Sequence, residues 1–188
     1  MKAVPPALRP GIRVIVLVGF MGAGKTTVGQ ELSRMLGWRF EDLDDLIQAR
    51  EAQTIEQIFQ QRGEAAFREL ERTVLGERIS GIGRSPLVLA LGGGAFVDEQ
   101  NRRILKAAGF PAVFLDAESD ELYERCAEPN IARPLRRNRH HFRALYESRR
   151  PHYLNAEIFI QTSGREVSSI ATEVISKLNL LPADGVPE

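Results

Sequence analysis

Short apolar runs alternate along this chain with longer segments in which apolar residues recur every three or four positions. Short runs bounded by turn residues are typical of buried β-strands, and they predict strands at residues 12–18, 39–42, 87–91, 112–115 and 158–161. The periodic segments are typical of amphipathic helices, and they predict helices at residues 25–36, 44–49, 54–61, 64–79, 99–108, 119–126 and 165–178.

This alternation predicts an α/β fold in which helices cover both faces of a parallel sheet, giving three layers. In such sheets, ligands bind at the edge where the strands have their carboxyl ends. The residues that directly follow the predicted strands are therefore the candidates for a functional site. They are residues 19–26, 42–45, 92–94 and 163–164.

The first of these segments matches the phosphate-binding pattern G-x-x-x-x-G-K-[ST], and it lies between a predicted strand and a predicted helix, as that pattern requires. Its glycines let the loop wrap around phosphate with N–H groups turned inward, and the helix N-terminus adds partial positive charge. Lys25 supplies a charge for the β- and γ-phosphates, and the Thr26 hydroxyl can ligate Mg²⁺. The nucleotide contacts expected here are Gly22, Ala23, Gly24, Lys25, Thr26 and Thr27.

Three aspartates close the second predicted strand, beside this loop. A carboxylate at this point can hold Mg²⁺, which prefers oxygen ligands and keeps part of its water shell. A second carboxylate can accept a hydrogen bond or a proton from the hydroxyl to be phosphorylated. We assign these functions jointly to Asp42 and Asp44. For Asp45, capping of the next helix is the favoured interpretation.

Three successive glycines, Gly92, Gly93 and Gly94, follow the third predicted strand. Glycine is costly in backbone entropy, so a plain connector seldom uses three. They favour a backbone that approaches a small substrate closely and offers it N–H donors. The alternative is a tight left-handed turn, which needs only one of them.

On the predicted helix at residues 64–79, Glu64, Arg68 and Glu71 share one face. Such a row of opposite charges is common on exposed helix surfaces and contributes little to stability. The spacing alone therefore favours an exposed salt-bridge ladder.

Arginines dominate residues 133–150, where Glu147 is the single acidic side chain. This segment can be a nucleic-acid surface, or a mobile lid whose guanidinium groups close on phosphate and on a substrate carboxylate. The lid is favoured, because Pro129 and Pro134 frame a stretch with no clear apolar face. Its aromatic residues are also spaced helically rather than as a base-stacking platform.

The composition is that of an ordinary globular domain, with 188 residues, 43% hydrophobic and 27% charged, and with balanced acidic and basic side chains. It argues against a nucleic-acid or membrane partner. The single cysteine, Cys126, excludes an internal disulfide framework, is expected in the core, and fits a reducing, cytoplasmic compartment. The three histidines lack metal-ligand spacing. We expect one domain at residues 11–180, a flexible leader at 1–10, a lid at about 127–141 and a flexible tail at 181–188.

In their order along the chain, these motifs resemble the shikimate kinase family. Besides the glycine loop, the resemblance rests on residues 40–45, 63–68, 92–94, 133–135 and 149–153, and it covers about residues 14–178. It implies a P-loop NTPase fold with a five-stranded parallel sheet and a mobile lid. It also implies a usually monomeric enzyme that transfers the γ-phosphate of ATP to the 3-hydroxyl of shikimate, in aromatic amino-acid biosynthesis.

The resemblance also implies roles for single residues of this chain. Asp42 and Thr26 would support Mg²⁺, and Asp44 would hydrogen-bond the substrate hydroxyls. Arg68 and Arg149 would bind the shikimate carboxylate. Glu71 would orient Arg68, and Gly92, Gly93 and Gly94 would form the substrate loop. Arg133 would be the lid arginine on the ATP phosphates, and Arg125 would border the adenine. Phe59 and Phe67 would form the pocket wall.

The chain departs from the family pattern in the lid, where Asn130, Ile131 and Ala132 replace the usual acidic residue and the following segment is short and basic. Two other functions stay open beside the shikimate kinase reaction. One is a different small-metabolite kinase of the same fold, such as a gluconate kinase. The other is a non-catalytic nucleotide-binding regulator, which would be expected to have lost Lys25 or one of the aspartates.

Overall fold

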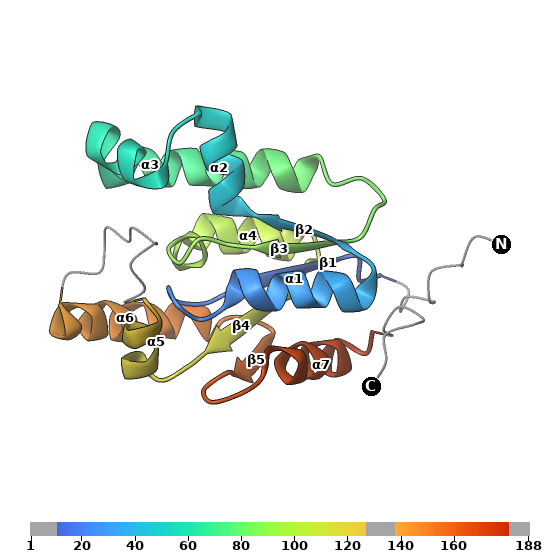
Figure 1. Ribbon diagram of the computed structural model, residues 1–188. Coiled ribbons are helices and arrows are strands. Elements are labelled where there is room, and N and C mark those ends of the chain that lie inside the picture. The colour runs from blue at the N-terminus through green and yellow to red at the C-terminus, as the bar shows by residue number, and fades with distance from the viewer. Residues whose placement is uncertain (1–10, 127–137, 181–188) are drawn as a thin grey trace.

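The computed structural model describes residues 11–126 and 138–180 and shows one sheet of parallel strands (Figure 1). The predicted five-stranded parallel sheet is confirmed, with the strand order β2-β3-β1-β4-β5. Each strand begins within two residues of its predicted start. The bounds are β1 Val14–Val18, β2 Arg39–Asp42, β3 Leu87–Ala90, β4 Ala112–Asp116 and β5 Ile158–Gln161.

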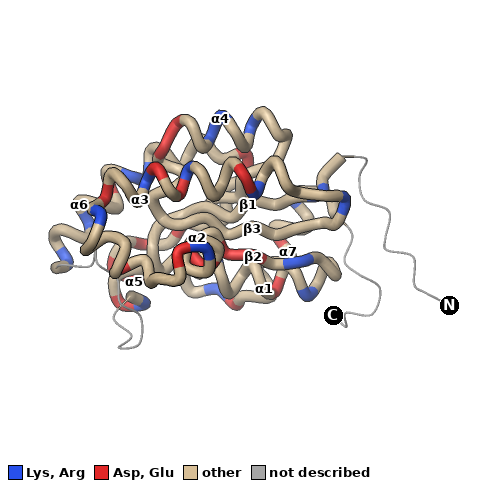
Figure 2. Tube along the Cα trace, turned by 90° about the horizontal axis from the view of Figure 1, so that it is seen from above, with Lys and Arg blue, Asp and Glu red and all other residues tan. Residues whose placement is uncertain are grey.

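Helices cover both faces of this sheet, so the predicted three layers are also confirmed. Figure 2 shows α1 and α7 together on one side, with α3, α4 and α6 on the other. The bounds are α1 Lys25–Leu36, α2 Leu43–Glu51, α3 Ile55–Ser80, a 3₁₀ turn η1 Ala95–Val97, α4 Glu99–Ala107, α5 Ser119–Arg125, α6 Arg139–Tyr153 and α7 Val167–Leu178.

The hydrophobic core runs along the central strands. Strand β1 lies between β3 and β4, with Val16 in register with both Leu89 and Ala112. Every residue of β1 is at most 1% exposed. A strand covered on both faces needs apolar side chains in both directions, and this explains why the sequence shows an uninterrupted apolar run there rather than an alternation.

Helix α3 replaces two predicted helices, because the chain continues through a kink at Gly63. Gly63 has φ 77° and ψ 173°, a conformation that side chains with a Cβ rarely adopt. The start of α3 is fixed by a capping box, in which the Thr54 hydroxyl accepts the backbone N–H of Gln57 while the Gln57 side chain accepts that of Thr54.

Helix α6 was not predicted, since the sequence was interpreted there as a lid without an apolar face. Its buried positions, Phe142, Tyr146, Arg149 and Tyr153, do follow helical spacing. One of the four is an arginine, so the buried face of the helix cannot be recognised in the sequence among the other arginines of the segment. Residues 139–141, assigned to the expected lid at 127–141, form the first turn of this helix. The rest of that lid, the expected leader and the expected tail lie outside the described residues.

The carboxyl ends of β1, β2 and β3 lead into three of the four segments singled out in the sequence, residues 19–26, 42–45 and 92–94, which places them at one edge of the sheet. Among the described helices, none has both the length and the apolar character needed to cross a lipid bilayer.

Candidate active site

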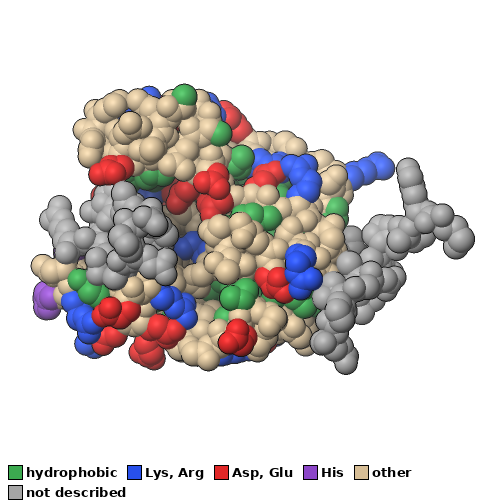
Figure 3. Space-filling model, viewed as in Figure 1, with side chains coloured by type: hydrophobic (Ala, Val, Ile, Leu, Met, Phe, Trp, Pro, Cys, Tyr) green, Lys and Arg blue, Asp and Glu red, His purple; other side chains and the backbone are tan. Residues whose placement is uncertain are grey.

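A cavity of about 1000 Å³ opens at this edge of the sheet. Figure 3 shows a recess between α2–α3 and the body of the molecule, with acidic and basic side chains at its rim. Its lining joins the glycine loop, the end of β2, the glycine triplet, α3 and α6 in one space. The predicted site residues that line it are Gly22, Ala23, Gly24, Lys25, Thr26, Thr27, Asp42, Asp44, Arg68, Gly92, Gly93, Gly94, Arg125 and Arg149.

The glycine loop has the backbone that only glycine adopts easily. Gly19, Gly22 and Gly24 have φ of 145°, 81° and 84°. A Cβ on Gly19 would lie 2.5 Å from the Leu115 carbonyl oxygen, and one on Gly22 would lie 2.8 Å from that of Leu122. Conformation thus requires all three glycines, and close packing requires Gly19 and Gly22 as well. The loop ends where α1 begins, at Lys25, which leaves the first N–H groups of that helix facing the cavity.

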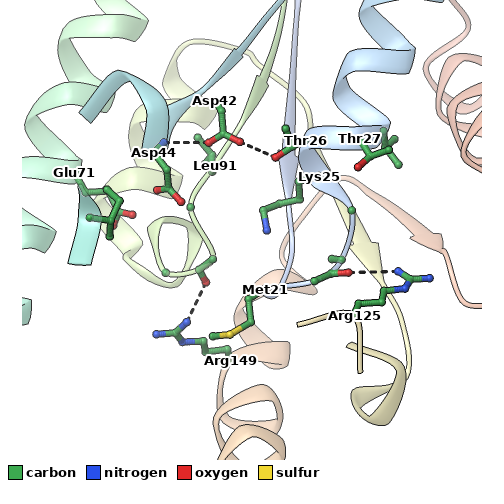
Figure 4. A pocket seen from close by; sticks show the side chains of 18 of the residues that line it. Met21, Lys25, Thr26, Thr27, Asp42, Asp44, Glu71, Leu91, Arg125 and Arg149 are labelled. Carbon is green, nitrogen blue, oxygen red and sulfur yellow. Dashed lines mark hydrogen bonds between the residues drawn. The ribbon is translucent and has the colours of Figure 1, made fainter. Parts of the chain in front are cut away.

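Lys25 lies over this loop. Its Nζ donates hydrogen bonds to the carbonyl oxygens of Gly19 and Phe20, both at 3.0 Å. Figure 4 shows the Lys25 and Asp44 side chains extending into the same space from opposite sides. A cation at this point is well placed for the outer phosphates of a nucleotide held by the loop.

Asp42 links the two halves of the cavity. Its Oδ2 accepts a hydrogen bond from the Thr26 hydroxyl at 2.8 Å, and its Oδ1 accepts the backbone N–H of Asp44 at 3.0 Å. Asp42 is therefore the N-cap of α2, so the expectation that Asp45 caps this helix is wrong. The helix begins one residue earlier than predicted, at Leu43, and this leaves Asp45 exposed in its first turn.

Asp44 is half-buried, and its pKa is raised to about 6. Loss of water is the main cause, and the neighbouring Asp42 carboxylate adds to it, whereas Lys25 and Arg68 act in the opposite direction. A carboxyl group with this pKa is mostly ionised at neutral pH. It can therefore accept a hydrogen bond from a substrate hydroxyl, and it is basic enough to take a proton.

Two glycines of the triplet, Gly92 and Gly94, are needed for space, and none of the three serves a left-handed turn. Neither Gly92, Gly93 nor Gly94 has a positive φ, so that alternative is wrong. A Cβ on Gly92 would lie 2.6 Å from Asp44 Oδ1, and one on Gly94 would lie 2.3 Å from Arg68 Nη1. The bare backbone at these positions lets the acidic and basic side chains of the cavity come close to it.

The predicted salt-bridge ladder on α3 is exposed at one end only. The Glu64 side chain is 56% exposed, but Arg68 is 21% and Glu71 only 1% exposed. Arg68 Nη1 lies 2.9 Å from Glu71 Oε2, and the guanidinium also stacks 5.1 Å from the Phe67 ring centroid. The prediction of an exposed salt-bridge ladder is therefore wrong for Arg68 and Glu71. Spacing could not distinguish the buried from the exposed end, because burial depends on the neighbouring elements.

Glu71 is a site residue that spacing alone undervalued. Burial raises its pKa to about 7, although the positive charge of Arg68 acts in the opposite direction. Its Oε1 has no hydrogen-bond partner among the described residues. That oxygen would lie 3.0 Å from a Cβ on Gly92. Phe59 and Phe67 line the cavity beside it, with ring centroids 4.5 Å apart, as expected for a pocket wall.

Arg149 enters the cavity from α6. It is 9% exposed, and its Nη1 lies 3.4 Å from the Gly93 carbonyl oxygen (Figure 4). Tyr153, one turn later, donates its hydroxyl to the same carbonyl oxygen. Tyr153 was not predicted as a site residue, although its helical spacing from Phe142 and Tyr146 was visible in the sequence.

Of the other predicted residues, Arg125 borders the loop, with Nη1 3.4 Å from the Gly22 carbonyl oxygen, and it pairs with Glu121. Arg133 lies outside the described residues. Cys126 is buried, as expected for a core residue. Within residues 11–126 and 138–180, no group of three or more His, Cys, Asp or Glu side chains could hold a metal ion.

Comparison with known proteins gives a consistent result. The family model described as shikimate kinase matches residues 21–179. A shikimate kinase of Persephonella marina is 38% identical over 167 residues, which cover 89% of this chain and 99% of that protein. A shikimate kinase of Cereibacter sphaeroides is 40% identical over 173 residues, which cover 90% of this chain and 84% of that protein. Among solved structures, shikimate kinase from Acinetobacter baumannii in complex with shikimate has a TM-score of 0.82 and 35% identity, covering 90% of this chain and 94% of that one.

Proposed function

This chain belongs to the shikimate kinase family and phosphorylates the 3-hydroxyl of shikimate with ATP, and we propose that the residues around its cavity divide that reaction between them. One observation carries the proposal. A single cavity holds a phosphate-binding loop on one side and two arginines, Arg68 and Arg149, with a glycine triplet on the other. This arrangement suits a nucleotide and a small anionic acceptor that meet face to face.

The nucleotide side comprises the loop and the start of α1. Backbone N–H groups of residues 22–27 bind the phosphates, and Lys25 carries the charge that faces the transferred group. Arg125 borders the adenine end of the cavity. Arg133 lies outside the described residues, and the resemblance of residues 133–135 to the family motif supports its assignment to the ATP phosphates.

Thr26 and Asp42 are the residues that would hold Mg²⁺. Their side-chain oxygens lie 2.8 Å apart at the nucleotide side of the cavity. Mg²⁺ is commonly bound by one or two protein oxygens, with phosphates and water completing the shell, so this small set fits it. Bound there, the ion would neutralise charge on the β- and γ-phosphates.

The acceptor side is built to hold a carboxylate. Two guanidinium groups, from α3 and α6, face the cavity, and a planar guanidinium matches a carboxylate in bidentate geometry. Arg68 is oriented by Glu71 at 2.9 Å. The glycine triplet leaves the backbone open for contact with the ring of the substrate. The acceptor is thereby fixed by its carboxylate, with a hydroxyl facing the loop.

Asp44 then acts on that hydroxyl. It stands between the two sides of the cavity, near Lys25 and Arg68. Ionised at neutral pH, it orients the hydroxyl by accepting its hydrogen bond. It can take the proton as the hydroxyl oxygen bonds to the γ-phosphorus and the bond from that phosphorus to ADP breaks. Phosphoryl transfer needs little covalent help from a protein, so most of the rate enhancement comes from positioning and charge neutralisation.

The remaining proposals concern the state of the enzyme. We expect a monomer in the cytoplasm, with no nucleic-acid or membrane partner. Balanced charge and a single buried cysteine support this expectation, and residues of one chain line the cavity from both the nucleotide and the acceptor side. The gluconate kinase and regulator alternatives lose their support, since the relatives that cover most of the chain are named shikimate kinases and Lys25, Asp42 and Asp44 all face the cavity.

The test is a coupled assay of ADP release with shikimate, gluconate or a nucleoside monophosphate as acceptor. We expect release to depend on shikimate, and Arg68→Ala to raise the KM for shikimate steeply. Arg72→Ala is the matched control, because Arg72 is one turn further along α3 and pairs with Asp98. It should leave the KM unchanged. An Arg68→Ala enzyme with unaltered kcat/KM for shikimate would rule out the carboxylate assignment.

A further inference from the structure

Phe20 belongs to the glycine loop, but its side chain packs against α6. It occupies a position that the P-loop pattern leaves unspecified, so phosphate binding does not require an aromatic residue there. The ring is 1% exposed. It makes edge-to-face contacts with Phe142 at 5.0 Å and with Tyr146 at 5.6 Å between ring centroids. The loop therefore carries one large side chain that reaches away from the nucleotide.

The same ring lies beside Arg149. The guanidinium carbon of Arg149 is 5.8 Å from the centroid of the Phe20 ring, within the range of a cation–π interaction. It also contacts the Gly93 carbonyl oxygen at 3.4 Å, which is a long hydrogen bond, and the hydroxyl of Tyr153. The guanidinium is thus held by an aromatic ring, a long hydrogen bond to a carbonyl oxygen and a neutral hydroxyl, and by no carboxylate among the described residues.

Two other arginines of this region are held differently. Arg68 pairs with Glu71 at 2.9 Å, and Arg150 pairs with Asp116 at the same distance. In the part of the chain that the structure describes, Arg149 has no ion pair of this kind. Glu71 occupies one N–H group of Arg68, whereas the ring of Phe20 orients the Arg149 guanidinium without occupying any of its N–H groups.

We propose that Phe20 is a positioning residue that holds the Arg149 guanidinium in place for the carboxylate of the acceptor. This inference rests on the proposed function, in which Arg149 binds that carboxylate. Phe20 is suited to the role because its backbone is also fixed. Its carbonyl oxygen accepts a hydrogen bond from the Lys25 ammonium at 3.0 Å. The nucleotide loop thereby contributes to the acceptor side of the cavity through a side chain that touches neither substrate.

Replacing the ring with a branched aliphatic group tests this role. Phe20→Leu keeps the site apolar and removes the ring face, so Arg149 is free to sample other rotamers. We expect the KM for shikimate to rise about tenfold, as loss of a desolvated cation–π contact implies. We expect the KM for ATP and the kcat to change less than about twofold. Titration calorimetry of shikimate binding to the nucleotide-free enzyme should show the same loss of affinity.

Phe142→Leu is the matched control. Phe142 belongs to the same aromatic cluster, packs edge-on against Phe20 and Tyr123, and lies on α6 as Arg149 does. This variant should lose stability to a similar degree and keep its KM for shikimate. If Phe142→Leu raises that KM as much as Phe20→Leu, the cluster only supports the fold, and the positioning role is excluded.

A double-mutant comparison separates this inference from the proposed function. In an Arg149→Ala background, Phe20→Leu should have no further effect on shikimate affinity. In an Arg68→Lys background, Phe20→Leu should still raise the KM for shikimate by the same factor as in the wild type. If Arg149→Ala itself leaves the KM unchanged, the carboxylate assignment fails. If Arg149→Ala raises the KM and Phe20→Leu does not, the assignment stands and the positioning role of Phe20 fails.

Discussion

The Asp42 carboxylate accepts a hydrogen bond from the Thr26 hydroxyl at 2.8 Å while its other oxygen caps α2 through the Asp44 N–H. One side chain therefore joins the glycine loop to the helix that carries Asp44. The bridge explains why the acidic and the phosphate-binding parts of the cavity keep a fixed separation. It also means that charge and capping at this position can be tested independently.

Asp42→Asn removes the negative charge but keeps an oxygen that can cap α2. We expect kcat/KM to fall roughly 10–100-fold and the Mg²⁺ concentration for half-maximal activity to rise. The free energy of unfolding should change little. Asp42→Ala also loses the cap and should cost about 1 kcal/mol more in stability. Kinetics across a Mg²⁺ titration and urea unfolding measure both effects, and an Asp42→Asn enzyme with normal Mg²⁺ dependence contradicts the metal assignment.

Asp44 should give the reaction an acidic limb near pH 6. Its pKa is raised to about 6, so the carboxylate is protonated as the pH falls through that value and can no longer accept the hydroxyl proton. We expect kcat/KM for shikimate to decline below about pH 6 and to level off above about pH 7. Asp45→Asn, a change at the exposed neighbour, should retain the limb. A wild-type profile that stays flat from pH 5 to pH 8 contradicts a role for ionised Asp44.

Gly94→Ala should disturb the acceptor side alone. The added Cβ would lie 2.3 Å from Arg68 Nη1, so the guanidinium must move away from the cavity. We expect the KM for shikimate to rise at least about tenfold, with the KM for ATP nearly constant. Gly93→Ala is the comparison, because its Cβ would meet Met21 N at an ordinary 3.5 Å. Equal effects from the two substitutions would show that close approach to Arg68 is not the reason for the glycine.

Two glycines of α3 should respond oppositely to alanine. Gly63 has φ 77° and ψ 173°, so Gly63→Ala should cost about 1–3 kcal/mol of stability and misalign Phe59 with Phe67 across the kink. Gly76 lies in the regular part of the helix with open space around it, so Gly76→Ala should stabilise by up to about 1 kcal/mol. Thermal or urea unfolding of both variants decides this. Destabilisation of equal size in both would mean that the kink is not the cause.

Local patterns predicted most of the fold because central strands and helices here have strong periodicity. Strands β2 and β5 and helix α1 have the predicted bounds. The prediction failed at α6, where Arg149 occupies a position on the buried face that an apolar residue normally takes. It also divided α3 at Gly63, since a glycine in a helical pattern looks like an end when the chain in fact continues through a kink.

The site was predictable to a similar degree and for similar reasons. The glycine loop and the residues that follow β2 and β3 could be located, because parallel strands bring their carboxyl ends to one edge. Glu71, Phe20 and Tyr153 could not be assigned from spacing. Each depends on a different element: Tyr153 donates to Gly93, Phe20 packs against α6, and Glu71 is enclosed beside Gly92.

The sequence by itself determined the order of the elements, the phosphate-binding loop and the identity of the chemical groups, because these depend on local conformation and on residue type. Only the tertiary structure decided which charges are buried. Glu64 and Glu71 share one helix face with Arg68, yet Glu64 is exposed to water and Glu71 is enclosed beside Gly92 and Asp44. Burial depends on what packs against the helix, and the removal of water is what turns an ordinary ion pair into a pair that can orient a substrate.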